Sequence, residues 1–142
     1  MNPYFEQVIL SASPVELIRL MYQKAIASVT DARDHLKAGR IRERAQAINK
    51  AYAILAELLI SLDVEKAPEL ATNLKRLYCY MQERLIEANF TQKDGPLAET
   101  VRLLSTLADA WQFVPEATGE HQQDYASERS EEGSFGCVAV MA

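Results

Sequence analysis

The sequence predicts an all-α protein, an antiparallel up-down four-helix bundle with a short N-terminal segment and a disordered acidic C-terminal tail. Four stretches carry apolar residues at intervals of three and four, which is the period of one helix face. Short links that contain glycine or proline separate these stretches, and no stretch alternates with a period of two as a strand would. In a chain of 142 residues, segments joined in this way favour an up-down bundle in one domain.

The first helix is predicted to begin at Ser13-Pro14-Val15-Glu16. Ser13 is a suitable N-cap, proline fits the first helical position, and Glu16 completes a capping box. Gly39 is expected to end the helix. A link of about three residues then makes the next helix an antiparallel neighbour. The apolar stripe of the first helix comprises Ile18, Met21/Tyr22, Ala25, Val29, Ala32 and Leu36.

The second helix is predicted from about residue 41 to 62 and has two apolar stripes. The main stripe comprises Ile41, Ala45, Ile48, Tyr52, Leu55, Leu59 and Leu62, and the second comprises Ala47, Ala51, Ile54 and Leu58. A helix that is apolar over most of its circumference must be buried on more than one side. Two interpretations stay open: a central helix of the bundle, or a surface that awaits a partner.

Pro68 follows a polar break at 63–66 and is predicted to open a third helix that ends near Phe90. Its stripe comprises Leu70, Leu74, Leu77, Met81, Leu85 and Ala88. A fourth helix is expected to start at Asp94 or Gly95. Its stripe, with coiled-coil-like spacing, comprises Leu97, Val101, Leu104, Ala108 and Trp111.

Charge divides the chain into two parts. Residues 1–113 hold 14 basic and 14 acidic side chains, whereas residues 114–142 hold one basic and six acidic ones and carry the whole net charge of −5. We therefore expect a bundle domain over 1–113 and a disordered tail over 114–142. Residues 135–142 are more apolar, and are either an incidental extension or a short docking peptide.

Several classes of protein are disfavoured. No apolar run reaches the roughly 18 residues that would insert into a membrane, and the N-terminus lacks a secretory signal, so we expect a cytosolic protein. Two cysteines, Cys79 and Cys137, are expected to be free thiols in a reducing cytoplasm. The sequence shows no catalytic motif, cofactor loop or metal-ligand spacing, and the acidic balance disfavours nucleic acid.

Five motifs in order carry a resemblance to a known family. Asn2-Pro3-Tyr4 with the run 11–22 resembles the N-terminal signature of the flagellar secretion chaperone family FliS, and the match continues through 71–74, 77–81, 84–89 and 107–111. The resemblance covers residues 2–113. One departure is Cys79, which stands where the family usually has aspartate.

The resemblance implies a cytosolic chaperone without catalytic activity or cofactor. Such a protein binds the disordered C-terminal segment of flagellin, prevents its premature polymerisation, and assists its delivery to the flagellar type III export apparatus. It implies a monomer or weak homodimer when free, with export gate components as possible partners. The alternative is a diverged FliS-like interaction or regulatory protein with a different helical-peptide client.

Eight residues are predicted to bind the client. In the family the N-terminal segment takes part in binding, and here Tyr4, Val8 and Ile9 suit a reversible plug; the alternative is a hydrophobic staple at the helix start. The candidates in the bundle lie off the main stripes or in the aromatic run 77–81, and plain core packing is their alternative. They are Ile54, Leu58, Tyr78, Tyr80 and Met81.

Overall fold

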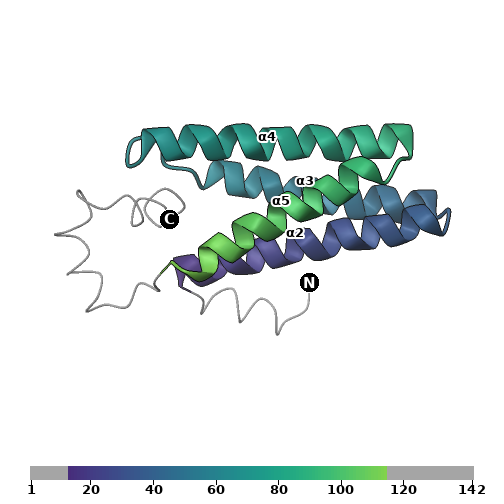
Figure 1. Ribbon diagram of the computed structural model, residues 1–142, viewed down its shortest axis with the longest axis horizontal. Helices are drawn as coiled ribbons and strands as arrows, with labels where there is room; N and C mark the ends of the chain where they lie inside the picture. Colours follow the sequence, from purple (N-terminus) through teal and green to yellow (C-terminus); the bar gives the residue numbers. More distant parts are fainter. Residues whose placement is uncertain (1–12, 115–142) are drawn as a thin grey trace.

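The computed structural model describes residues 13–114, which form four helices. These are α2 (Pro14–Lys37), α3 (Ile41–Ile60), α4 (Pro68–Thr91) and α5 (Gly95–Gln112). α2 packs against α3 and α5, and α4 packs against the same two helices, so α2 and α4 are diagonal partners (Figure 1). This arrangement confirms the predicted up-down four-helix bundle.

The two ends of the bundle differ in their connections (Figure 1). One end, here called the two-loop end, carries the links 38–40 and 92–94. The opposite one-loop end carries the link 61–67, the first turn of α2 and the last turn of α5. The predicted N-terminal plug residues Tyr4, Val8 and Ile9 and nearly all of the predicted tail lie outside the described residues.

The helix boundaries follow the local signals closely. Ser13 Oγ accepts a hydrogen bond from the Glu16 N–H at 3.2 Å, as expected for an N-cap. Gly39 has a φ of 72°, a left-handed conformation that glycine adopts without strain. α3 ends at Ile60 rather than near Leu62, because Asp63 Oδ1 accepts hydrogen bonds from the N–H groups of Glu65 and Lys66 and forms a turn there.

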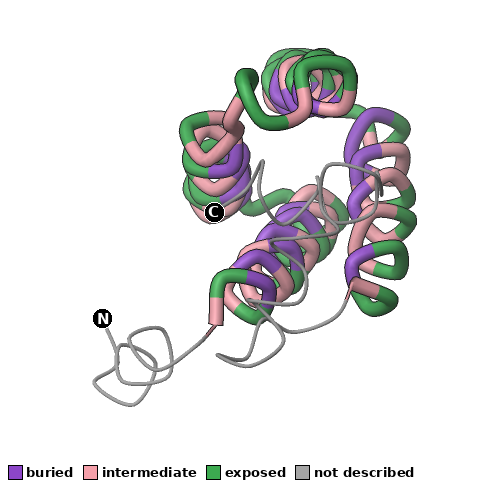
Figure 2. Tube along the Cα trace, turned by 90° about the vertical axis from the view of Figure 1, so that its left-hand side faces the viewer, coloured by how far each residue is buried: buried purple, intermediate pink, exposed green. Residues whose placement is uncertain are grey.

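Each helix turns its buried sector toward the interior of the bundle (Figure 2). The buried face of α3 comprises Arg44, Ile48, Ala51, Leu55 and Leu58. This face combines members of both predicted stripes, whereas Ile41 and Tyr52 of the main stripe are exposed. Among the described helices, the main neighbours of α3 are α2 and α4, and the sector that faces these two helices is narrower than the apolar part of the α3 surface.

A tyrosine pair links the diagonal helices in the core. The hydroxyl oxygens of Tyr22 on α2 and Tyr78 on α4 lie 2.5 Å apart, and both side chains are fully buried. The Tyr22 ring also packs on Trp111 of α5, with 6.5 Å between ring centroids. A hydrogen bond between buried hydroxyls satisfies polar groups that would otherwise be costly to bury, and it joins helices that do not pack side by side.

Two arginines bind the C-terminal ends of neighbouring helices. Neither α4 nor α5 has a basic residue in its own last turn. Arg44 of α3 donates to Asn89 Oδ1 at 3.2 Å and to the Asn89 carbonyl at 3.3 Å. Arg19 of α2 donates to the carbonyls of Trp111, Gln112 and Val114 at 3.0, 3.3 and 2.7 Å. Both cations lie at the negative ends of helix dipoles, where they are stabilising.

Candidate functional site

The structure divides the predicted binding residues of the bundle into a core group and a surface group. Leu58, Tyr78 and Met81 are fully buried members of one hydrophobic cluster. Ile54 is half-buried and packs against that cluster, and Tyr80 is 41% exposed on α4. The bundle therefore presents Ile54 and Tyr80 at its surface, while the other three fill its interior.

Tyr80 is held across the seam between α4 and α5. Its hydroxyl donates to both carboxylate oxygens of Glu99 at 2.9 Å, and Arg84 Nε donates to Glu99 Oε1 at 2.6 Å. The hydrogen bond from Tyr80, together with Arg84, lowers the pKa of Glu99, and the neighbouring carboxylate raises the pKa of Tyr80. Arg84 also pairs with Glu87. This partly exposed network orients the Tyr80 ring.

The sequence interpretation missed most of the exposed apolar surface. Among the described residues, seven large apolar side chains besides Tyr80 are exposed. At the two-loop end these are Ile41, Ile86 and Phe90; at the one-loop end Ile60, Val64 and Phe113; and between them Tyr52. One signal was available for Ile60, since three consecutive apolar residues at 58–60 cannot all face one core.

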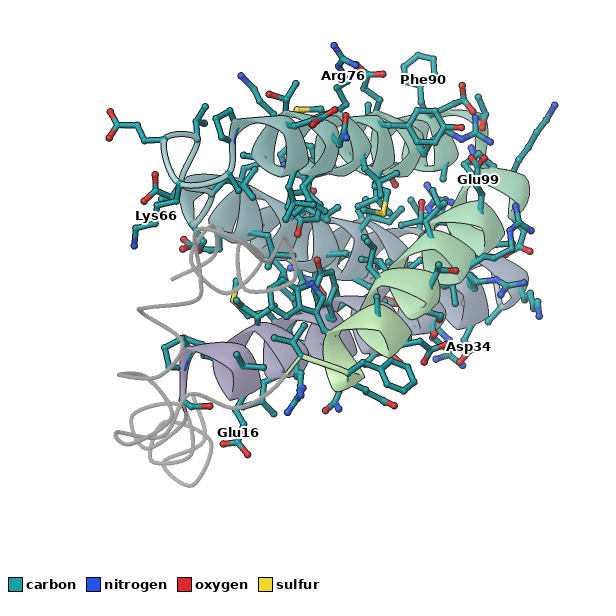
Figure 3. All side chains as sticks on the ribbon, turned by 60° about the vertical axis from the view of Figure 1, so that its left-hand side comes forward. Glu16, Asp34, Lys66, Arg76, Phe90 and Glu99 are labelled. Carbon is teal, nitrogen blue, oxygen red and sulfur yellow. The ribbon has the colours of Figure 1, made fainter. Side chains whose placement is uncertain are left out.

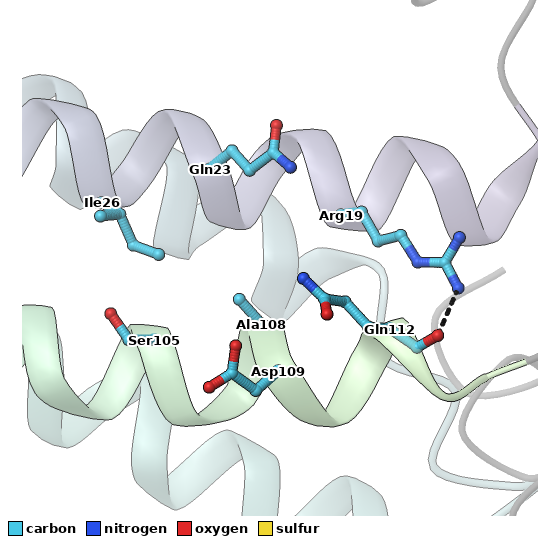
Figure 4. Close-up of a pocket in the computed structure, with 7 residues that line it drawn as sticks. All are labelled: Arg19, Gln23, Ile26, Ser105, Ala108, Asp109 and Gln112. Carbon is cyan, nitrogen blue, oxygen red and sulfur yellow. Dashed lines mark hydrogen bonds between the residues drawn. The ribbon is translucent and has the colours of Figure 1, made fainter.

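A surface groove lies between α2 and α5 (Figure 4). Its volume is about 410 Å³. The lining is half apolar and half polar, and comprises Arg19, Gln23, Ile26, Ser105, Ala108, Asp109 and Gln112. Small side chains on α5, Ser105 and Ala108, leave room between the two helices. A groove of this kind suits peptide side chains better than a buried cofactor.

Within residues 13–114, no group of three or more histidine, cysteine, aspartate or glutamate side chains is placed to hold a metal ion. No helix in the same range is both long enough and apolar enough to cross a membrane. A complete helical core with apolar side chains left on its outer faces is typical of a helical-bundle protein that binds other proteins.

The comparisons with known proteins specify this class further. The family model described as "Flagellar protein FliS" matches residues 1–118. The flagellar secretion chaperone FliS of Salmonella typhimurium is 38% identical over 115 residues, 80% of this chain and 85% of that protein. FliSB of Pseudomonas aeruginosa is 37% identical over 109 residues, 77% of this chain and 86% of that protein. FliS of Bacillus subtilis is 26% identical over 141 residues, 97% of both chains.

The chain belongs to the FliS family of flagellar secretion chaperones. This confirms the resemblance that the N-terminal signature and the four later motifs indicate. The family is one of chaperones and not a known family of enzymes, so a client protein is implied.

Proposed function

We propose that this protein is a cytosolic export chaperone that binds the disordered C-terminal segment of flagellin. It prevents premature polymerisation of flagellin and assists its delivery to the flagellar type III export apparatus, and it catalyses no reaction. The observation that carries the proposal is the large apolar side chains exposed outside an already complete core. Exposed apolar surface of this kind marks sites of protein interaction.

The proposed client fits this surface by its chemistry. A disordered segment that contains amphipathic helices can lay their apolar faces along the seams of a bundle, as in other helix-in-groove complexes. The half-buried Ile54 on α3 and Tyr80 beside the α4–α5 seam are the predicted residues that such a helix can reach. Because the client must become ordered on binding, a large apolar contact area is needed to offset that cost.

The three buried candidates have a different role in this proposal. Leu58, Tyr78 and Met81 support the surface from beneath, and they contact the client only where the side chains above them move aside. Tyr4, Val8 and Ile9 remain our candidates for a plug that the client displaces. We propose that residues 1–113 form the chaperone domain and that the free protein is a monomer or a weak homodimer.

Calorimetry of the full chain with the C-terminal segment of the cognate flagellin tests the proposal. We expect one-to-one binding with a negative heat-capacity change, as for an interface of at least about 1,200–2,000 Å². Absence of binding at tens of micromolar by the folded protein would refute the flagellin proposal and favour a FliS-like protein with another helical client.

Substitutions at position 80 locate the contact. Tyr80→Ser removes the exposed ring, and we expect it to weaken client binding about tenfold while the melting temperature changes little. Tyr80→Phe is the matched control, because it keeps the ring and removes only the hydrogen bonds to Glu99. Equal loss of affinity in both variants would assign the effect to the hydrogen bonds and not to the ring.

A further inference from the structure

Three exposed apolar side chains lie together at the two-loop end. Ile41 opens α3, while Ile86 and Phe90 are one turn apart near the end of α4, and the three side chains are 60%, 55% and 88% exposed. The hydrogen bonds from Arg44 to Asn89 join the first turn of α3 to the last turn of α4. The three residues therefore occupy one corner of the bundle, here called the apolar corner, and Phe90 points outward from it (Figure 3).

Basic side chains surround the apolar corner. Residues 33–44 and 84–94 hold seven basic and four acidic side chains. Two of those acids, Glu87 and Asp94, are already paired with Arg84 and Arg33. Four of the cations at this end of the bundle are exposed: Lys37, Arg40, Arg42 and Lys93. The corner thus combines apolar surface with positive charge and suits a partner that is both acidic and apolar.

The opposite end of the bundle has the opposite charge. Six acidic side chains gather at the one-loop end, against the two basic side chains of Arg19 and Lys66. The acids are Glu16, Glu57, Asp63, Glu65, Glu69 and Asp109. The chain leaves the described structure at this end, where the Val114 carbonyl accepts a hydrogen bond from Arg19. An acidic segment that follows Val114 is therefore repelled by the acidic side chains of the one-loop end.

The chain itself supplies a segment with the required chemistry. Residues 116–132 contain six acidic side chains and one basic one, and residues 135–142 are largely apolar. The bundle is about 36 Å long, since α2 has 24 residues at 1.5 Å each. The 20 residues 115–134 reach about 66 Å when fully extended. The acidic segment is therefore long enough to bring residues 135–142 to the two-loop end.

We propose that residues 116–142 dock on the two-loop end of their own bundle. The acidic side chains of 116–132 face Arg40, Arg42 and Lys93, and the apolar residues 135–142 cover Ile41, Ile86 and Phe90. The attraction is intramolecular, so the effective concentration of the segment is high even where the direct contact is weak. This docking does not depend on the identity of the client.

A spin label on the segment tests the docking in the full chain. Cys79→Ser leaves Cys137 as the single thiol, to which a nitroxide is attached, and the relaxation of amide protons is measured by NMR. We expect the amide signals of 40–42 and 86–90 to lose more than half of their intensity while those of 60–65 keep most of theirs. Even broadening at both ends, or broadening at the one-loop end, would overturn the proposal.

Charge variants separate docking from chance encounter. Arg40→Glu with Arg42→Glu is expected to abolish the broadening, whereas the matched control Lys75→Glu with Arg76→Glu, on an exposed part of α4, is expected to preserve it. Glu128→Gln with Glu131→Gln and Glu132→Gln provides a second test that leaves the bundle unchanged. Broadening that persists in both charge variants would contradict docking through these charges.

A mixed sample identifies the occupant. Spin-labelled chains without ¹⁵N are combined with unlabelled ¹⁵N chains, so that any broadening must come from another molecule. We expect none in this sample. Broadening of 40–42 and 86–90 here would assign the apolar corner to a second copy and overturn the intramolecular proposal.

Discussion

The two ends of the bundle hold their helices together in different ways. At the two-loop end, Arg44 is 5% exposed and binds only Asn89 among the described residues, and a bidentate pair joins Arg33 to Asp94 at 2.8 and 2.9 Å. At the one-loop end, the half-buried Arg19 donates to two carbonyls in the last turn of α5 and to that of Val114 just beyond the helix. One end thus depends on a desolvated cation and the other on a partly hydrated one.

This difference predicts unequal sensitivity to mutation. A buried polar partner that loses its hydrogen bond keeps its full desolvation cost, whereas an exposed one recovers bonds to water. We therefore expect the buried Arg44 of the two-loop end to tolerate substitution poorly, unlike the more exposed Arg33–Asp94 pair at the same end. The half-buried Arg19 at the one-loop end should tolerate substitution better than Arg44.

The largest effect is expected at Arg44. Arg44→Ala removes the donors to Asn89 and leaves space where the buried side chain packed, so we expect the free energy of unfolding to fall by about 2 kcal/mol. Urea unfolding followed by circular dichroism measures this change. Arg44→Met is the control, since it keeps the apolar stem without burying a charge, and it should lose less than about 1 kcal/mol. Equal losses in Arg44→Ala and Arg44→Met would mean that the charged group of Arg44, and not the packing of its stem, accounts for its contribution to stability.

A smaller effect is expected at Arg19. Arg19→Ala removes a cation from the C-terminal end of α5, and we expect a loss of about 1 kcal/mol together with faster hydrogen exchange of the amides of 110–114. Arg19→Lys keeps the charge but cannot reach three carbonyls at once. Its free energy of unfolding should therefore lie between those of the wild type and Arg19→Ala. A loss larger than that of Arg44→Ala would reverse the ranking of the two ends.

The smallest effect is expected at the Arg33–Asp94 pair. The hydrogen bond from Arg33 lowers the pKa of Asp94 below its ordinary value of 3.8. The pair therefore stabilises the fold fully above about pH 3.8, and this contribution disappears as the pH falls through the lower pKa of the folded state. Both side chains are about one-third exposed, so we expect Asp94→Asn to cost only about 0.5 kcal/mol at pH 7.

Urea midpoints of the wild type and Asp94→Asn, measured from pH 7 down to pH 2, check this dependence. The difference between the two urea midpoints should be constant near neutral pH and should shrink toward zero at low pH. A difference that grows as the pH falls would contradict the assigned direction of the pKa shift.

Local signals in the sequence were sufficient for the helices. Ser13, Pro14, Gly39, Pro68 and the 94–96 stretch mark helix ends within about two residues, because capping and φ restrictions act over neighbouring positions only. The single apolar stripe of α2 also predicted its buried face, because a helix with only one apolar stripe has only one face that it can pack against a core.

The sequence by itself determined four amphipathic helices, their order, and the family motifs. Only the tertiary structure decided which part of the apolar circumference of α3 is buried, because that depends on the angle between α2 and α4. The same holds for Arg19, whose three carbonyl partners lie more than 90 positions away, and for the Tyr22–Tyr78 pair. Helical periodicity specifies which residues share a face, but the packing of all four helices selects the faces that meet.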